Sequence, residues 1–112
     1  KIERDRVLDI IKTQPKQQQL TTYSILEFYN KGKKIFTGEI YEDYLDLCKK
    51  VGLKPLTQRR ISDIISEFDM LGVINAKVIS KGRYGRTRDI SVEIPEITLP
   101  KIKSILEGSI NV

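Results

Sequence analysis

The spacing of apolar residues changes once along this chain, and that change limits the folds open to it. Up to residue 71 apolar side chains recur every three or four residues, whereas between residues 74 and 94 they alternate with polar ones. The first spacing is that of an amphipathic helix, and the second is that of a strand with one buried face. The chain is therefore expected to form helices followed by one β-hairpin, and Thr98 and Pro100 indicate a closing helix.

Four helical segments are expected before the hairpin, over residues 1–13, 16–30, 37–51 and 57–71. Thr37 and Thr57 are expected to cap the last two of them, and Ile35 and Phe36 are expected to add a short strand. The residues that separate the segments are proline or glycine: Pro15, Gly32, Gly52, Pro55 and Gly72. The apolar residues at core spacing on the last two segments are Tyr41, Tyr44, Leu45, Cys48, Val51, Ile61, Ile64, Ile65, Phe68 and Leu71.

The composition argues against catalysis. The chain has no histidine and one cysteine, so the common zinc sites and histidine-dependent mechanisms are excluded. It also lacks a phosphate loop of the G-x-x-x-x-G-K-S/T type. Four acidic residues cluster between Glu39 and Asp46, where they are expected to favour the start of a helix. No apolar run approaches the roughly 20 residues of a membrane span. We therefore expect no enzyme, cofactor, metal or membrane partner in this chain.

The distribution of charge indicates a polyanionic partner. The net charge is +5, and the isoelectric point is near 9.4. Two segments contain basic residues and no acid: residues 49–60 hold five, and residues 81–88 hold four. A basic stretch is often only a solvated face, so each segment has to be judged by its place in the fold.

Helix, helix, turn, helix and hairpin is the order of a winged helix-turn-helix, a mainly α fold with a small β-hairpin. In that fold the helix over residues 57–71 enters the major groove of DNA. Arg59 is expected to reach guanine O6 and N7, and Asp63 to orient that guanidinium or accept from cytosine N4. Thr57 and the amides beside it are expected to hold a phosphate. The residues expected on the DNA-facing side are Gln58, Arg59, Arg60, Ser62, Asp63 and Ser66. A solvated helix face is the alternative interpretation.

The tip of the hairpin carries the stronger signal. A turn needs glycine or asparagine for its backbone, but it does not need three arginines. Glycine lets the backbone approach phosphates, and arginine is favoured in a narrow minor groove. The residues expected to contact DNA from this wing are Lys81, Gly82, Arg83, Tyr84, Gly85, Arg86 and Arg88. Tyr84 is expected either to pack on sugars or simply to cover the hairpin. A charged, solvated loop is the alternative interpretation of the segment.

Four segments together resemble the C-terminal winged-helix domain of archaeal replication initiators, relatives of the origin-recognition-complex and cell-division-control ATPases. They are residues 37–41, 55–63, 71–76 and 80–87, with the sequences TGEIY, PLTQRRISD, LGVINA and SKGRYGRT. The similarity extends roughly from Leu20 to Leu106. It implies DNA contacts by Arg59, Arg60 and Ser62 on the helix and by Arg83, Tyr84 and Arg86 on the wing.

The resemblance also implies a wider setting for the domain. Residues 15–112 would be the winged-helix domain, and residues 1–14 a helix or linker from a separate ATPase module. ATP and magnesium are expected only for that module. The expected partners are double-stranded origin DNA, other initiator subunits and the replicative helicase, in a cytoplasmic, chromosome-associated protein. A winged-helix transcription regulator and a winged-helix protein-interaction module remain as alternatives.

Overall fold

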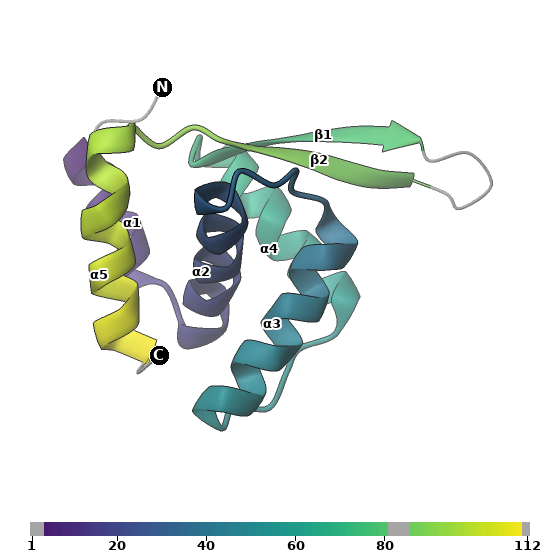
Figure 1. The fold of residues 1–112 in the computed structure, drawn as a ribbon, viewed down its shortest axis with the longest axis horizontal. Helices are drawn as coiled ribbons and strands as arrows, with labels where there is room; N and C mark the ends of the chain where they lie inside the picture. The colour runs from purple at the N-terminus through teal and green to yellow at the C-terminus, as the bar shows by residue number, and fades with distance from the viewer. Residues whose placement is uncertain (1–3, 81–85, 111–112) are drawn as a thin grey trace.

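Five α-helices and a two-stranded antiparallel sheet form the fold within residues 4–80 and 86–110, which this computed structural model describes (Figure 1). The elements are α1 (Arg4–Thr13), α2 (Lys16–Asn30), α3 (Thr37–Val51), α4 (Gln58–Met70), β1 (Ile74–Ser80), β2 (Arg86–Val92), a 3-10 turn (Glu96–Thr98) and α5 (Leu99–Ile110). The predicted fold class, mainly α with a β-hairpin, is therefore confirmed.

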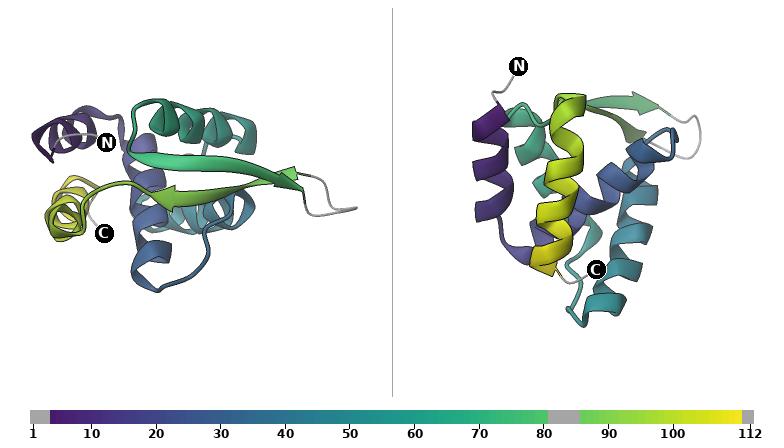
Figure 2. Two further views of the ribbon diagram at one scale, coloured as in Figure 1. Left: turned by 90° about the horizontal axis from the view of Figure 1, so that it is seen from above. Right: turned by 60° about the vertical axis from the view of Figure 1, so that its left-hand side comes forward.

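Helix α2 lies at the centre of the helical layer. Helices α3 and α4 contact it on one side, and α1 and α5 lie side by side next to it (Figures 1 and 2). The hairpin crosses the ends of these helices, with β1 against α4 and β2 against α3. Val7, Leu8 and Ile11 of α1 are buried in the same core as the rest of the chain. The division of the chain at residue 14 stays a prediction.

The central position of α2 explains why its buried surface includes polar residues. Residues 18–26 are all buried, and side chains within them find partners on neighbouring elements. The Gln19 amide donates to the carbonyl of Ile11 on α1 at 3.1 Å and accepts from the Ser109 hydroxyl on α5 at 2.7 Å. Buried amides need such bonds, because an unpaired polar group in a core costs about 1–3 kcal/mol. Gln19 therefore ties α1 and α5 to the centre.

Most of the predicted helix boundaries are confirmed, and the cap at Thr37 is wrong. Gly32, Gly52 and Gly72 have the positive φ values of 68°, 76° and 82° that end a helix. The Thr57 hydroxyl caps α4 by accepting from the Arg60 amide at 3.2 Å. Helix α3, however, begins at Thr37 itself, with no side-chain cap. The residue before it, Phe36, is still extended because its backbone forms a bridge to Asp89 of β2.

Two apolar residues lie farther from the core than their spacing predicts. Leu71 is 41% exposed because α4 ends one residue earlier and the chain turns at Gly72. Val78 is 58% exposed although Ile74 of the same strand is buried. The reason is that the outer part of the hairpin extends beyond the helices (Figure 1). The residues that join the hairpin to the core are Ile74, Ala76, Ile90, Val92 and Ile94.

Two carboxyl groups meet between α2 and α3. The Asp43 carboxylate accepts a 2.7 Å hydrogen bond from the Ser24 hydroxyl. Burial raises the pKa of Glu27 above its usual value, and repulsion from Asp43 and a hydrogen bond between the two carboxyls act in the same direction. Lys31 and Lys103 have a smaller opposite effect on this pKa. The folded chain therefore holds a proton at Glu27 more tightly than the unfolded chain does.

Glu27→Gln is expected to raise the midpoint of thermal unfolding at pH 7, because a neutral amide does not repel Asp43. The pKa of Glu27 is higher in the folded chain than in the unfolded chain. The stability of the parent therefore falls as the pH rises from the unfolded pKa through the folded pKa. The gain should consequently be larger at pH 7 than at pH 4. Thermal melts between pH 4 and pH 8 check this, with Glu42→Gln, exposed on α3, as the control. A Glu27→Gln midpoint below that of the parent at pH 7 contradicts the account.

Candidate nucleic-acid interface

The start of α4 is held in place by a polar junction under the turn that precedes it. The Tyr44 hydroxyl donates to Gln17 Oε1 and accepts from the Leu56 amide at 2.8 Å. The Gln17 amide donates to the Lys54 carbonyl at 2.8 Å, and the Tyr41 hydroxyl donates to the Leu56 carbonyl at 2.9 Å. Burial raises the pKa of Tyr44 to about 12, so the hydroxyl stays protonated at neutral pH. The turn is therefore fastened to both α2 and α3.

Helix α4 buries one face and exposes the opposite face of its first two turns. Its buried face consists of Ile61, Ile64, Ile65 and Phe68. Gln58, Arg59, Arg60 and Asp63 are exposed, as the spacing predicts. Ser62 and Ser66 are half-buried, because they lie on the flank of α4 that faces the hairpin. The exposed basic side chains of α4 are thus both at its N-terminal end, whereas the exposed Glu67 and Asp69 lie in its C-terminal half.

The base of the hairpin is fixed to the loop between α2 and α3. The Ile90 amide of β2 donates to the Ile35 carbonyl at 2.9 Å, next to the bridge between Phe36 and Asp89. The short strand expected at Ile35 and Phe36 is therefore present as a single bridge that widens the sheet at its inner end. The hairpin is consequently joined to the start of α3, and both lie beside α4.

Arg88 differs in position from a free arginine at a hairpin tip. Its Nη1 atom donates to the Ser62 carbonyl at 3.1 Å and to Ser66 Oγ at 2.6 Å, both on α4. Three of the residues expected to contact DNA are thus bonded to one another. The strand register gives the reason: Arg88 pairs with Val78 and lies two residues before the buried Ile90, so both point toward the helices. Whether Arg88 also contacts DNA stays a prediction.

The remaining wing residues are not placed by the structure. Residues 81–85 lie outside the described residues, and so does the side chain of Arg86. The contacts expected from Lys81, Gly82, Arg83, Tyr84, Gly85 and Arg86 therefore stay predictions.

A shallow notch of about 460 Å³ opens where α3, α4 and β2 meet. Gln58, Ser62 and Arg88 were expected near DNA, and the notch brings these three residues together. Its other lining residues, which the sequence analysis did not assign to the DNA-facing set, are Thr37, Gly38, Val78 and Thr87. The available signal was the pair Ile35 and Phe36, because a strand at that point carries the start of α3 to the hairpin.

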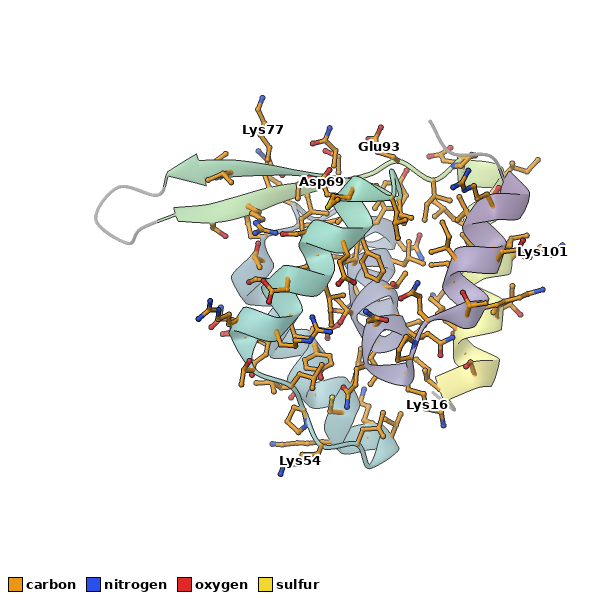
Figure 3. All side chains as sticks on the ribbon, turned by 180° about the vertical axis from the view of Figure 1, so that it is seen from behind. Lys16, Lys54, Asp69, Lys77, Glu93 and Lys101 are labelled. Carbon is orange, nitrogen blue, oxygen red and sulfur yellow. The ribbon has the colours of Figure 1, made fainter. Side chains whose placement is uncertain are left out.

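Basic side chains lie at both ends of the α4 and hairpin face. Figure 3 shows Lys54 on the turn before α4 and Lys77 projecting from the hairpin on the side away from the helices. Both are exposed, as are Arg59 and Arg60 between them in sequence. Lys101, on α5, lies on the opposite side of the molecule (Figure 3). Several exposed cations are therefore available along the face that contains α4.

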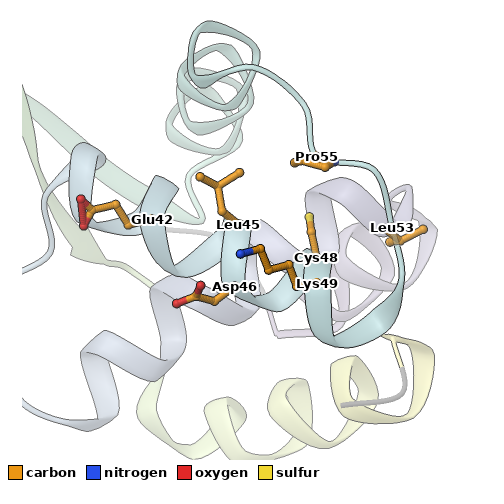
Figure 4. Close-up of a pocket in the computed structure, with 7 residues that line it drawn as sticks. All are labelled: Glu42, Leu45, Asp46, Cys48, Lys49, Leu53 and Pro55. Carbon is orange, nitrogen blue, oxygen red and sulfur yellow. The ribbon is translucent and has the colours of Figure 1, made fainter.

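A second notch lies beside the end of α3 and does not resemble a catalytic site. It is lined by Glu42, Leu45, Asp46, Cys48, Lys49, Leu53 and Pro55 (Figure 4). Burial raises the pKa of the Cys48 thiol, which keeps it protonated rather than nucleophilic at neutral pH. Among the described residues, no group of three metal-ligating side chains is brought together. Nor is any described helix long and apolar enough to cross a membrane.

Comparison with known proteins identifies relatives of this fold and sequence. "ORC1-type DNA replication protein 1" of Methanosarcina mazei is 50% identical over 98 residues, which are 85% of this chain and 24% of the relative. "ORC1-type DNA replication protein" of Pyrococcus horikoshii is 53% identical over 95 residues, covering 84% of this chain and 23% of the relative. The chain thus spans about a quarter of the length of these curated relatives.

Two solved structures share the fold. The Aeropyrum pernix Orc1 protein, solved in complex with DNA, superposes with a TM-score of 0.84 at 40% identity, covering 95% of this chain and 27% of that one. Cdc6p from Pyrobaculum aerophilum has a TM-score of 0.72 at 14% identity, covering 98% of this chain and 26% of that one, and shows the fold alone.

A family model agrees with these similarities and with the resemblance expected from the wing and helix segments. It is described as "CDC6, C terminal winged helix domain" and matches residues 9–100. That range contains α2 to β2 and therefore the whole helix-turn-helix and hairpin. This chain belongs to the family of Cdc6 C-terminal winged-helix domains.

Proposed function

We propose that this chain binds double-stranded DNA and recognises replication-origin sequences as the winged-helix domain of an initiator. The observation that carries the proposal is the placement of α4. Its first two turns expose Gln58, Arg59 and Asp63 beside a hairpin that is hydrogen-bonded to the loop before α3. The DNA complex of the 40% identical Aeropyrum pernix Orc1 protein supports the same interpretation.

In this proposal α4 enters the major groove with its N-terminal end. Arg59 supplies a guanidinium that can bond guanine O6 and N7 together, and a good bidentate pair discriminates by about 1–3 kcal/mol. Asp63 follows Arg59 by one helical turn, at the spacing where a carboxylate can orient a guanidinium. The Thr57 cap and the amides beside it present a partial positive charge to a backbone phosphate.

The hairpin is proposed to follow the backbone or the minor groove next to α4. The exposed Lys77 and the arginines at positions 83 and 86 supply charge, which attracts any DNA sequence alike. In this proposal α4 therefore distinguishes DNA sequences, and the wing adds affinity that does not depend on sequence.

The full-length protein is proposed to act in replication initiation. The relatives of this chain are named DNA replication proteins and are about four times as long. This proposal includes a separate ATPase module that binds ATP and magnesium. It also includes contacts with other initiator subunits and with the replicative helicase, in a cytoplasmic, chromosome-associated protein. Selection of bound fragments from the source genome tests it, because origin-proximal repeats support an initiator and promoter elements support a transcription regulator.

Affinity for duplex DNA is expected to fall steeply with salt. If four to six phosphates are neutralised, log K plotted against log salt should have a slope of about −4 to −5. Titration of a labelled duplex between 50 and 300 mM salt, followed by fluorescence anisotropy, measures the slope. An affinity that does not change over this range removes the electrostatic basis of the proposal.

Separate variants of α4 and the wing are expected to lose different properties. Arg59→Ala should cost about 1–3 kcal/mol on the preferred duplex and little on a scrambled one. The double variant Arg83→Ala, Arg86→Ala should weaken binding to both duplexes and reduce the salt slope by about 1 per lost phosphate contact. Lys101→Ala, which removes an exposed charge from α5, is the control and should bind like the parent. Parent-like binding of both duplexes by the double variant would show that the wing is not a DNA element.

A further inference from the structure

We propose that Arg88 is a positioning residue that fixes the angle between the hairpin and α4, so that both can meet DNA at once. The inference deepens the proposed DNA-binding function and depends on it for its biological meaning. The geometry it concerns is, however, a property of the free protein and can be measured without DNA.

The contact is a closed hydrogen-bonded set. Arg88 Nη1 donates to the Ser62 carbonyl at 3.1 Å and to Ser66 Oγ at 2.6 Å. The Ser66 hydroxyl in turn donates to the same Ser62 carbonyl at 3.2 Å. The Ser62 carbonyl oxygen and Ser66 Oγ therefore both accept a hydrogen bond from Arg88, and all three residues are half-buried. Hydrogen bonds from a cation in such a place are shorter and stronger than neutral ones.

The position of these hydrogen bonds along the hairpin determines how strongly they control its direction. Closer to the core, Ile74 and Ile90 hold the strands by apolar packing. Two residue pairs beyond Ile90, where Val78 faces Arg88 across the sheet, the side chain of Val78 is 58% exposed. Arg88 thus takes over where apolar packing ends. A strand adds about 3.3 Å per residue, so a small rotation at this point becomes a larger shift at the outer end of the hairpin.

The same contact defines which part of α4 is free to read bases. Ser62 and Ser66 lie one turn apart on the flank next to the hairpin, where Arg88 bonds the backbone carbonyl of Ser62 and the side-chain hydroxyl of Ser66. Gln58, Arg59 and Asp63 remain exposed. Losing Arg88 would therefore remove the side-chain hydrogen bonds that hold the hairpin against this flank of α4.

The first experiment measures the free protein and compares Arg88→Ala and Ser66→Ala with Lys77→Ala, which is the matched control for this distance measurement alone. Lys77→Ala also removes one positive charge from the hairpin, but from an exposed position that faces away from the helices (Figure 3). Spin labels at Asp63→Cys on α4 and Ile79→Cys on β1, in a Cys48→Ser background, report the distance distribution between the two elements in the free protein. Arg88→Ala should broaden the distribution, Ser66→Ala should broaden it less, and Lys77→Ala should leave it unchanged.

Affinity for the preferred duplex supplies the second measurement. Arg88→Ala should weaken binding on the order of tenfold, which corresponds to about one charge-assisted hydrogen bond, and Ser66→Ala on the order of threefold. The combined variant should bind like Arg88→Ala alone, because the two residues act through one contact. Circular dichroism confirms that each variant is folded, and Ser66→Ala keeps the test available if Arg88→Ala does not fold.

Two results would overturn the positioning role. The first is a distance distribution that stays as narrow in Arg88→Ala as in the parent. The second is a loss in Arg88→Ala that lowers the salt slope by about 1 while Ser66→Ala binds normally, since Arg88 would then contact a phosphate itself. A parent chain that does not bind duplex DNA would refute the proposed function instead, and the distances in the free protein would still decide the role of Arg88.

Discussion

The hydroxyl of Tyr44 lies where α2, α3 and the turn before α4 meet, and the position of α4 depends on it. It donates to Gln17 of α2 and accepts from the Leu56 amide, and the Tyr41 hydroxyl donates to the Leu56 carbonyl. A turn held at its amide and its carbonyl cannot shift along the helices without leaving a buried polar group unpaired. The Thr57 cap follows directly, so the first turn of α4 starts from a fixed point. What this end of the helix presents to a partner is therefore determined by the core.

The hairpin is attached by three kinds of contact in succession. Ile74 and Ile90 are buried, backbone bonds join β2 to the loop before α3, and Arg88 reaches α4 farther out. Attachment thus changes from apolar burial to charged hydrogen bonds as the strands leave the core. Such a gradient suits a wing that must hold its direction while it stands in solvent, where apolar side chains would favour aggregation rather than order.

Periodicity predicted the helices, the hairpin and the exposed first turns of α4 because each depends on local spacing. It failed where a contact between distant segments decides the outcome. Thr37 resembles a cap in sequence, but the bridge between Phe36 and Asp89 makes Phe36 the last extended residue, so the helix begins one residue earlier, at Thr37 itself. Arg88 resembles the other wing arginines, yet its register with Ile90 turns it toward α4. The alternation along β2 predicts this direction, because residues 88 and 90 share a face of the strand. In the sequence analysis Arg88 is instead grouped with the other wing arginines because of its charge.

The most direct test of the account is a map of the backbone amides that change when the chain binds duplex DNA. Two-dimensional amide spectra of the labelled chain, free and with a preferred duplex, give a shift for each residue. The largest changes are expected at the Thr57 cap, in residues 58–63 of α4 and along the outer hairpin, with α1 and α5 little affected. Large changes confined to α1 and α5, with α4 unchanged, would contradict it, because DNA would then be bound by the opposite side of the molecule.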